Sequence, residues 1–408
     1  MRRVIMVYDA ASVYNVKVIM GVATYLQERA NFTVAIEDNA LGRQRLPDFR
    51  SCDGIIAGLD DPTVASALGE SRVPIVGFGG GYRWNSRCAS IPYFRTNNRS
   101  IARLAADHLL KRGFKHFAYV GYPRTNTNAW SHLREAEFVK YIASRGFPCP
   151  VFHGQDVFRI HYKSTHRWAA MQKSLAAWLG KLPKPLGVMA ANDGRGRHVL
   201  EACRAYNLRV PDDIAVIGVD NDELLCKLSS PPLSSVEQGA RKLGYAAAAL
   251  LDEIMDGRKT RRRCIVVDPT GIVTRHSTDV LAIDDLTIRR AMEFIRRHGC
   301  DGIKVPDVIA DAGISRSGLE NRFASVLGTT IHAAIRCHKV ETARKKILES
   351  EMPLKQIAAE TGFKSVQLMT KLFAETIGQT PAKYRRTESQ TKPWDFAGDA
   401  HERISLKT

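Results

Sequence analysis

Long apolar runs are absent from this sequence of 408 residues. No stretch approaches the roughly 18 to 20 apolar residues that cross a bilayer, so we expect no membrane-spanning helix. Residues 1–9 carry a basic pair and only a short apolar run. A secretory signal needs a longer apolar core and a small-residue cleavage site. We therefore interpret these residues as a first strand and expect a cytoplasmic protein.

Paired cysteines are also absent. The eight cysteines are scattered and form no C-x-x-C pair. Scattered cysteines are typical of small apolar packing residues in a reducing compartment, and a metal or disulfide role is the less favoured alternative. The spacing therefore predicts no metal site.

Catalytic and cofactor-binding motifs are missing as well. The sequence has no G-x-S-x-G elbow, no Walker lysine, no H-E-x-x-H and no G-x-G-x-x-G that opens a helix. His198 and Cys203 share a predicted helix, where packing explains them better than a nucleophilic pair. We therefore expect no catalytic residue, no cofactor and no enzymatic activity.

The charge balance favours a polyanionic partner, but it says little about which part of the chain binds that partner. The net charge is +18 over the chain. Residues 281–408 hold 21 Lys and Arg against 16 Asp and Glu, which leaves most of the excess positive charge in the first 280 residues. A strongly basic C-terminal surface is therefore not expected, and nucleic-acid binding must be inferred from motifs.

A short helical pattern occurs twice near the C-terminal end, at residues 303–328 and 353–378. The turn glycines of the two copies, Gly313 and Gly362, lie 49 positions apart. Each copy reads as an apolar-faced helix, a turn at the glycine, and a helix that opens with small polar or basic residues. Glycine accepts a positive φ, and the second helix can enter the major groove. The repeat predicts two helix-turn-helix units that read two successive groove faces.

The exposed face of each second helix supplies the candidate DNA contacts. Arginine suits guanine, asparagine and glutamine suit adenine, and lysine and serine more often hold phosphates. The alternative is an ordinary solvated helix surface. The candidates are Arg316, Ser317, Glu320 and Asn321 in the first unit and Ser365, Gln367, Leu368 and Lys371 in the second. In the closing run 378–386, Arg385 and Arg386 are expected near phosphates.

Through about residue 280, short apolar strands alternate with amphipathic helices. Strands are predicted at 4–8, 32–37, 54–58 and 73–78, and a second series at 117–121, 187–192 and 214–219, with closing strands at 264–268 and 270–275. Such alternation favours parallel, doubly wound sheets with ligands at the carboxyl ends of the strands. Two series predict two lobes with a cleft between them.

The expected domain limits follow from these patterns. Lobe 1 covers about 1–97 and 222–262, and lobe 2 covers about 98–221 and 263–278. Residues 281–286 form a linker, residues 287–388 form an all-α DNA-binding domain, and 389–408 form a polar tail.

Several runs of sequence resemble known families. VMAAND at 188–193, VPDDIAVIGVDN at 210–221 and PLSSV at 232–236 resemble the type I periplasmic-binding-protein-like effector domain of LacI/GalR regulators. The repeats at 303–386 resemble the AraC-type DNA-binding domain. This order of domains, with Gly79-Gly80 and the runs at 193–198, 233–241 and 313–317, resembles the xylose-operon transcription activators. The resemblance covers nearly the whole chain.

A pentose pocket needs carboxylates, amides and an arginine for paired hydrogen bonds, and an aromatic ring to cover the apolar face of the sugar. Candidates of these types fall at predicted strand ends or in loops that face the cleft. They are Tyr14, Asn15, Asn97, Trp130, Asp193, Arg195, Asp220 and Gln238. Asp193 and Asp220 could instead cap the following helix or turn, and Trp130 could be ordinary packing.

Two positions depart from the family pattern. Asn97 replaces the usual acidic residue, and His132 stands where binders of this fold often place an arginine. An amide cannot offer a charged acceptor, so the identity or affinity of the sugar can differ.

The resemblance implies a sugar-responsive regulator, with a double-stranded DNA operator, a sugar effector (xylose first) and RNA polymerase as partners. It also implies a homodimer whose DNA-binding heads are rearranged when sugar closes the lobes. Another pentose, a hexose or a purine remains open as the ligand. A sugar-binding transport protein is the more distant alternative.

Overall fold

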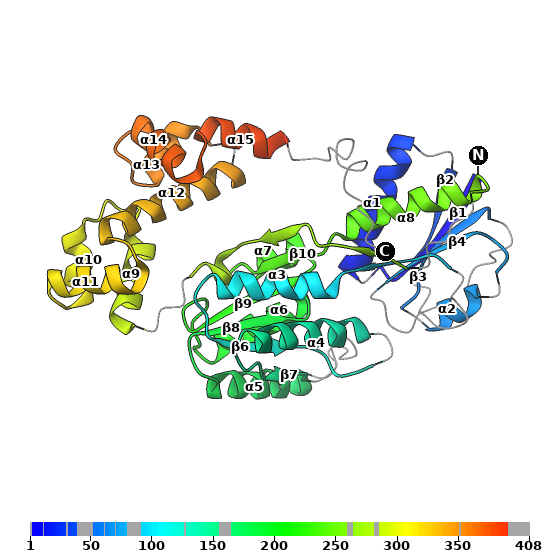
Figure 1. Ribbon diagram of the computed structural model, residues 1–408, viewed down its shortest axis with the longest axis horizontal. Coiled ribbons are helices and arrows are strands. Elements are labelled where there is room, and N and C mark those ends of the chain that lie inside the picture. The colour runs from blue at the N-terminus through cyan, green and yellow to red at the C-terminus, as the bar shows by residue number, and fades with distance from the viewer. Residues whose placement is uncertain are drawn as a thin grey trace. The chain divides into compact units, whose positions relative to one another are not determined.

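The computed structural model describes residues 2–10, 12–29, 32–38, 52–60, 62–69, 71–79, 91–125, 128–154, 165–258, 264–280, 285–350 and 352–390. The chain separates into two compact units, Met1–Ala282 and Ile283–Thr408 (Figure 1). Gly80, most of the expected linker and nearly all of the expected tail lie outside the described residues. Among the described helices, none has both the length and the apolar character required to span a membrane.

The first sheet of the first unit has the strand order β11-β5-β4-β3-β1-β2. Each neighbouring pair in it is parallel. The central strand β3 is buried along nearly its whole length, as expected for a parallel sheet covered on both faces. The strands are β1 (Arg2–Tyr8), β2 (Phe32–Asp38), β3 (Gly54–Gly58), β4 (Ile75–Gly79), β5 (Tyr93–Thr96) and β11 (Cys264–Val267).

The second sheet has the order β12-β10-β9-β8-β6-β7. Its strands are parallel except β12, which is antiparallel to β10. The strands are β6 (His116–Val120), β7 (Val151–Phe152), β8 (Leu186–Ala190), β9 (Ile214–Val219), β10 (Ser234–Glu237) and β12 (Gly271–Val273). Two sheets of this kind confirm the predicted α/β fold with two lobes.

Helices cover both sheets. The first lobe carries α1 (Val13–Arg29), α2 (Pro62–Leu68) and α8 (Ala240–Met255). The second lobe carries α3 (Asn98–Leu110), α4 (Ala129–Ser144), α5 (Thr165–Lys181), α6 (Asp193–Ala205), α7 (Glu223–Leu228) and a short 3₁₀ turn, His276–Thr278. The sequence reading did not anticipate α2, α5, α7, β5, β7 or β10.

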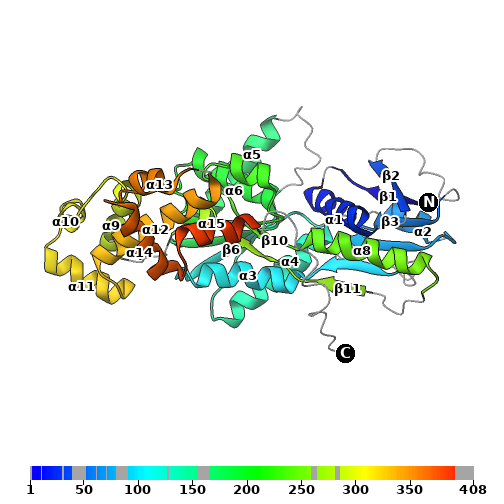
Figure 2. The same ribbon diagram turned by 90° about the horizontal axis from the view of Figure 1, so that it is seen from above.

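Two glycines allow α1 and α8 to lie side by side, as Figure 2 shows. A Cβ on Gly21 would lie 2.0 Å from the Arg241 carbonyl oxygen, and one on Gly244 would lie 1.9 Å from the Val18 carbonyl oxygen. No side chain fits at such distances. The two helices bury Val22 and Leu251 against the first sheet, which makes this contact part of the core of the lobe.

The chain crosses between the lobes three times, and two expected lobe limits are wrong. Residues 234–237 form β10 in the second sheet and not part of lobe 1, while residues 264–267 form β11 in the first sheet and not part of lobe 2. The polar run of β10 reads as a loop, yet it pairs with β9. For β11, the open edge beside β5 decides the sheet that it joins, and its own sequence does not.

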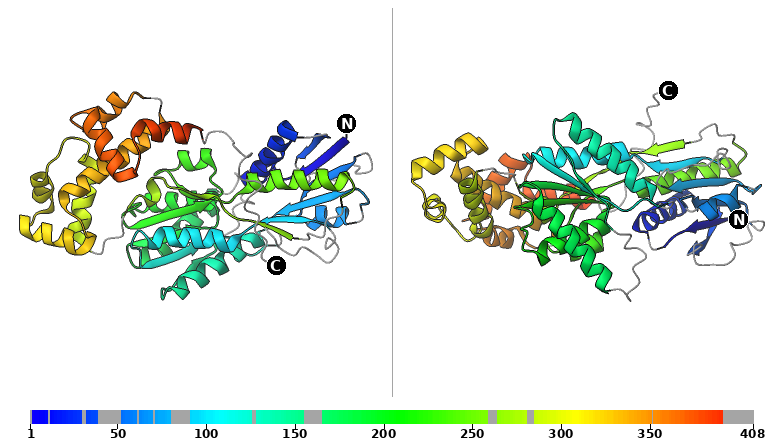
Figure 3. Two further views of the ribbon diagram at one scale, coloured as in Figure 1. Left: turned by 45° about the horizontal axis from the view of Figure 1, so that its top comes forward. Right: turned by 90° about the horizontal axis from the view of Figure 1, so that it is seen from below.

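The regular secondary structure among the described residues of the second unit is helical. The helices are α9 (Leu286–His298), α10 (Val305–Ala312), α11 (Arg316–Leu327), α12 (Ile331–Glu349), α13 (Leu354–Glu360), α14 (Val366–Ile377) and α15 (Pro381–Gln390). The long helix α12 takes part in two cores. Ile331 and Ile335 pack with α9, α10 and α11, whereas Val340 and Ile347 pack with α13, α14 and α15. Figure 3 shows these as a yellow and an orange-to-red group of helices joined through α12.

Both glycine turns of the predicted helix-turn-helix units are present. Gly313 has φ 71° and Gly362 has φ 70°, the left-handed conformation that glycine adopts without strain. At Gly362 a Cβ would also lie 2.3 Å from the Cys300 carbonyl oxygen. Ser315 and Ser365 then cap α11 and α14 by accepting backbone N–H groups. The duplicated pattern is therefore two structural units of the same design.

Candidate functional site

Polar side chains from both lobes meet where the chain crosses between the sheets. Lys17 and Thr96 come from the first lobe, Gln238 comes from a crossing, and the other three come from the second lobe. We call this group the interlobe cluster; its members are Lys17, Thr96, Asn98, Arg134, Asp220 and Gln238. All of them except Asp220 are buried. Most lie at the carboxyl ends of strands or in the first turns of helices, the edge at which parallel sheets bind ligands.

Arg134 of α4 lies at the centre of the interlobe cluster. Its Nε donates to Asn98 Oδ1 at 3.1 Å, its Nη2 donates to Gln238 Oε1 at 3.2 Å, and its Nη1 donates to the Ala191 carbonyl. The guanidinium carbon also lies 5.1 Å from the centre of the Trp130 ring. Arg134 therefore joins an amide of the second lobe to one at a lobe crossing while it stacks on an aromatic ring.

Asp220 ends β9 with φ 106°, a conformation that is uncommon for a residue other than glycine. Gln238 donates its side-chain amide to the Asp220 carboxylate, and Lys17 donates to the Asp220 backbone carbonyl. Burial raises the pKa of Asp220 to about 6, although the cations Arg134 and Lys17 lower it. The carboxylate is thus an anion held at a cost in free energy between two cations.

Gln238 ties the crossings together. Its Oε1 accepts from Thr96 Oγ1 at 3.0 Å as well as from Arg134. Beside it, Lys17 also pairs with Glu237. Asn98 contributes a further feature, because its Nδ2 is buried and has no hydrogen-bond partner among the described residues. A buried donor without a partner is uncommon and points to an acceptor supplied from outside the chain.

Tyr14 and Trp130 provide the aromatic surfaces that were predicted. Tyr14 Oη donates to the Gly79 carbonyl at 3.4 Å. Burial raises the pKa of Tyr14 well above its ordinary value, with smaller contributions from Asp60 and Asp220, so its hydroxyl stays a donor. Trp130 meets Tyr122 edge-on at 6.0 Å. The nearby Asn15 donates to the Asp9 carbonyl at 3.0 Å and shapes the loop before α1.

Asn97 makes contacts within the protein. Its Oδ1 accepts the Ser100 N–H at 3.2 Å and caps α3, while its Nδ2 donates to Asp268 at 2.8 Å. Asp268 follows β11 at the third crossing. The amide therefore joins two crossing segments, a contact that an acidic residue at this position could not make with Asp268 without charge repulsion.

Asp193 and Arg195 also have protein partners. The Asp193 carboxylate accepts from Ser235 Oγ at 2.6 Å and from the Asp222 N–H at 2.7 Å. Burial, followed by the charge of Asp220, raises the pKa of Asp193 well above its ordinary value. Arg195 lies 4.2 Å from the Tyr122 ring centre, and its Nη2 donates to the His153 carbonyl at 2.8 Å. Both side chains hold the loops around the interlobe cluster in place.

The sequence reading missed Lys17, Asn98 and Arg134. A signal for Arg134 was present, because residues 134, 138 and 142 share one face of α4 with helical spacing and Phe138 and Ile142 are core residues. Arg134 lies two residues after His132, the position at which an arginine was expected. His132 itself lies with Glu135 and His153, the described residues that could together hold a metal ion.

The candidate DNA contacts all lie exposed on α11 and α14. On α11 the inward residues Leu319 and Phe323 are fully buried, and on α14 Met369 and Phe373 take the equivalent places. Leu368 is 39% exposed. The exposed faces are Arg316, Ser317, Glu320 and Asn321 on α11 and Ser365, Gln367, Leu368 and Lys371 at the start of α14.

Two of these candidates have local roles as well. Arg316 pairs with Glu320 one turn away at 2.9 Å on the surface of α11, and the Ser365 hydroxyl caps α14. Arg385 is turned inward, because its Nη2 donates to the Met352 carbonyl at 2.7 Å. Arg386 lies exposed.

Models of three protein families match successive parts of the chain. A model described as the XylR N-terminal domain matches residues 3–99, the periplasmic binding protein-like domain matches 106–278, and a helix-turn-helix domain matches 308–387. The predicted AraC-type helix-turn-helix domain is thereby confirmed.

Similar proteins match over almost the full length. The chain is 35% identical to the xylose operon regulatory protein of Escherichia coli (strain K12) over 390 residues, 95% of this chain and 98% of that one. It is 32% identical to the xylose operon regulatory protein of Haemophilus influenzae over 384 residues, 94% and 98% of the two chains. A solved structure of a xylose-binding transcription activator, xylR, is 35% identical with a TM-score of 0.73 and covers 95% of this chain and 98% of its own.

These relatives are transcription regulators and not enzymes, which agrees with the expected absence of catalysis. The two-lobed domain, the paired helix-turn-helix units and the identity along the whole chain lead to one conclusion: the chain belongs to the family of xylose operon regulatory proteins.

Proposed function

We propose that this protein is a xylose-responsive activator of transcription, which binds the sugar between the lobes of its first unit and operator DNA through α11 and α14. The interlobe cluster is the observation that carries the proposal. It gathers a buried arginine, a carboxylate and two amides beside an aromatic ring, the groups that a pentose requires. The names of the full-length relatives support xylose as the sugar.

Within this site we assign direct contacts with the sugar to five side chains. Asp220 would accept hydrogen bonds from hydroxyl groups, and Asn98 Nδ2 and Arg134 would donate to sugar oxygens. Trp130 would cover the apolar face of the ring, with the Tyr14 hydroxyl as a further donor.

The other candidates would position these groups. Asn97 and Gln238 would hold the crossings, Asn15 would hold the loop before α1, and Asp193 and Arg195 would hold the loops of the second lobe, because each already has partners within the protein. Because some of these contacts join segments of the two lobes, we expect the shape of the site to change when one lobe moves relative to the other.

For the DNA end, we propose that Arg316, Asn321 and Gln367 contact base edges. Ser317, Ser365 and Lys371 would hold phosphates, Leu368 would contact a thymine methyl group, and Glu320 would orient Arg316. A homodimer in the cytoplasm, with RNA polymerase as a further partner, would bind two half-sites. Sugar would change the equilibrium between arrangements of the DNA-binding units, which requires different sugar affinities in the two arrangements.

Calorimetry on the full chain tests the ligand. D-xylose, a second pentose, a hexose and a purine base are titrated into the protein and into Asp220→Asn. We expect D-xylose to bind with the highest affinity and the variant to bind it about 10- to 100-fold more weakly, the loss of a hydrogen bond to a charged group. Asp256→Asn is the matched control, because Asp256 is a surface carboxylate that pairs with Arg2.

The DNA end is tested separately by fluorescence anisotropy on duplexes selected from a random pool. Arg316→Ala should weaken binding by about 1–3 kcal/mol if it reads a base edge.

Tighter binding of the purine or the hexose than of D-xylose would refute the sugar assignment. DNA affinity, footprint and transcription that all stay unchanged with D-xylose would refute the coupling.

A further inference from the structure

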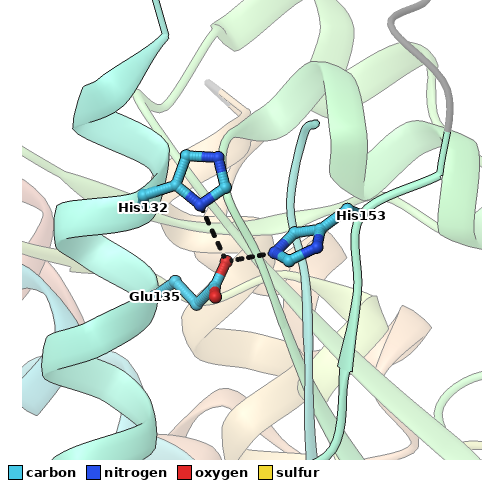
Figure 4. Close-up of side chains that lie close together, drawn as sticks. All are labelled: His132, Glu135 and His153. Atoms are coloured by element: carbon cyan, nitrogen blue, oxygen red, sulfur yellow. Dashed lines mark hydrogen bonds and ion pairs between the residues drawn. The ribbon is translucent and has the colours of Figure 1, made fainter. Parts of the chain in front are cut away.

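Two histidines and a glutamate of the second lobe lie together outside the interlobe cluster. His132 and Glu135 are one turn apart on α4, and His153 follows β7. Glu135 Oε2 lies 2.7 Å from His153 Nε2 and 3.4 Å from His132 Nδ1. Figure 4 shows both rings directed at this carboxylate from two different segments of the chain. One ligand atom from each residue lies within 4.8 Å of the others.

His132 lacks the hydrogen bonds that a buried imidazole ordinarily makes. Its side chain is 12% exposed, and neither ring nitrogen makes a hydrogen bond of ordinary geometry with the described residues, although its polar neighbours include the Glu135 carboxylate and the Pro123 backbone. Leaving a buried polar atom unpaired costs free energy, so such an atom calls for a partner.

The geometry suits a tetrahedral metal ion of the zinc class. Bonds of about 2.0–2.2 Å from zinc to imidazole nitrogen and carboxylate oxygen place neighbouring ligand atoms about 3.3 Å apart. The separation of 3.4 Å between Glu135 and His132 already matches this value, and that of 2.7 Å to His153 needs only a small opening. The His153 side chain is 41% exposed, which leaves a route for the ion from solvent.

We propose that His132, Glu135 and His153 form a binding site for a divalent transition-metal ion of the zinc class, with water in the fourth position. Calcium and magnesium are not the preferred ions for this site, because they favour oxygen donors and two of its three donors are imidazole nitrogens. The spacing of the cysteines did not predict this site, because no cysteine takes part in it. The two histidines lie 21 positions apart in the sequence, so they do not form a local motif.

The proposed site is linked to the interlobe cluster through α4, and to the loops around that cluster through Arg195. The His153 backbone carbonyl accepts from Arg195 Nη2 at 2.8 Å. Helix α4 carries Arg134 and Trp130 on the same turns as His132 and Glu135. A bound ion would therefore join α4 to the segment after β7 and hold Arg134 in place. The metal site stands whether or not the sugar assignment of the interlobe cluster is correct.

Metal binding to the purified full chain, stripped with a chelator, is the first test. Zinc is titrated by competition with a chromophoric chelator, and cobalt is titrated by visible absorption. We expect one tight equivalent of zinc, and a cobalt spectrum of a tetrahedral site without the sulfur charge-transfer band that exposed cysteines such as Cys264 or Cys337 would give. A spectrum dominated by sulfur ligation would assign the ion to cysteine and overturn the proposal.

Variants then locate the ion. His153→Ala and Glu135→Gln should each weaken zinc binding by more than the roughly 10- to 100-fold that loss of a second-shell partner costs. His332→Ala, an exposed histidine of α12, is the matched control and should bind zinc as the parent does. Circular dichroism shows whether each variant is folded, and because His153 is partly exposed its variant tolerates the change. Unchanged zinc affinity in folded His153→Ala would overturn the proposal.

Discussion

Replacing Asp220 by Asn should make the first unit more stable while it weakens sugar binding. Burial raises the pKa of Asp220 from the ordinary 3.8 to about 6, even with two cations nearby. This difference corresponds to about 3 kcal/mol by which the native protein disfavours the ionised form. Asparagine removes the charge, can still accept from Gln238, and tolerates the positive φ at this position better than alanine does.

The sign of the effect follows from proton linkage. The native protein binds the Asp220 proton more tightly than the unfolded chain does, so this group lowers the stability as pH rises between about 4 and 6. Above pH 6 the full penalty is present, and below pH 4 both states are protonated and the penalty vanishes. Asp220→Asn should therefore exceed the parent in stability by up to about 3 kcal/mol at pH 7, and by nothing near pH 4.

Thermal unfolding at pH 5 and pH 7.5, without sugar, measures this prediction. We expect the variant to melt roughly 5–10 °C higher at pH 7.5 and by clearly less at pH 5. Asp256→Asn, which removes an exposed carboxylate, should change the stability little at either pH. A variant that is less stable than the parent at pH 7.5, or a difference that does not depend on pH, would refute the account of Asp220 as a strained buried anion.

Three further changes test the packing and the DNA surface. Gly244→Ala places a Cβ 1.9 Å from a carbonyl oxygen of α1 and should lower the free energy of unfolding, measured in urea, by about 1–3 kcal/mol. Gly180→Ala is the control, because a Cβ there meets nothing within 4 Å and should not lower the stability. Equal unfolding midpoints for the two variants would contradict the close contact between α1 and α8. Ser365→Ala removes the cap of α14 and should lower the free energy of unfolding by about 1 kcal/mol. Ser365→Asp should keep the cap and the stability but lose DNA affinity. Unchanged DNA affinity of Ser365→Asp in fluorescence anisotropy would exclude a phosphate contact. Glu320→Gln weakens the ion pair that orients Arg316 and should reduce DNA affinity up to about fivefold at low salt; tighter binding would exclude Glu320 as the residue that orients Arg316.

Much of the fold could be predicted because its patterns are local. The strands at 54–58 and 214–219 are continuous apolar runs, and the structure has them at the same residues. β10 was missed for a physical reason. Ser234 and Ser235 are fully buried in the second sheet, and their hydroxyls are satisfied by partners distant in sequence, such as Asp193 and the Arg275 carbonyl. No local pattern reveals such partners.

The candidate site was predicted in part. Carboxylates and amides that follow strands, such as Asp220 and Gln238, could be found because parallel strands end at a common edge. Lys17 could not, since a cation on an amphipathic helix ordinarily faces solvent. The position of Arg134 on the same face as Phe138 and Ile142 indicated that it is buried but did not identify its partners. Only the packing of α1 and α4 beside the lobe crossings buries the two cations and supplies Asp220, Asn98 and Gln238 as partners.

The sequence by itself determined the two kinds of domain and their order, because hydrophobic periodicity and the repeated glycine turns at Gly313 and Gly362 act over a few residues. It also determined the family, through identity along the whole chain. Only the tertiary structure decided which sheet β10 and β11 join, which cations are buried between the lobes, and that His132, Glu135 and His153 meet. The physical reason is that charge, burial and hydrogen bonding of a side chain depend on neighbours that folding brings from elsewhere in the chain.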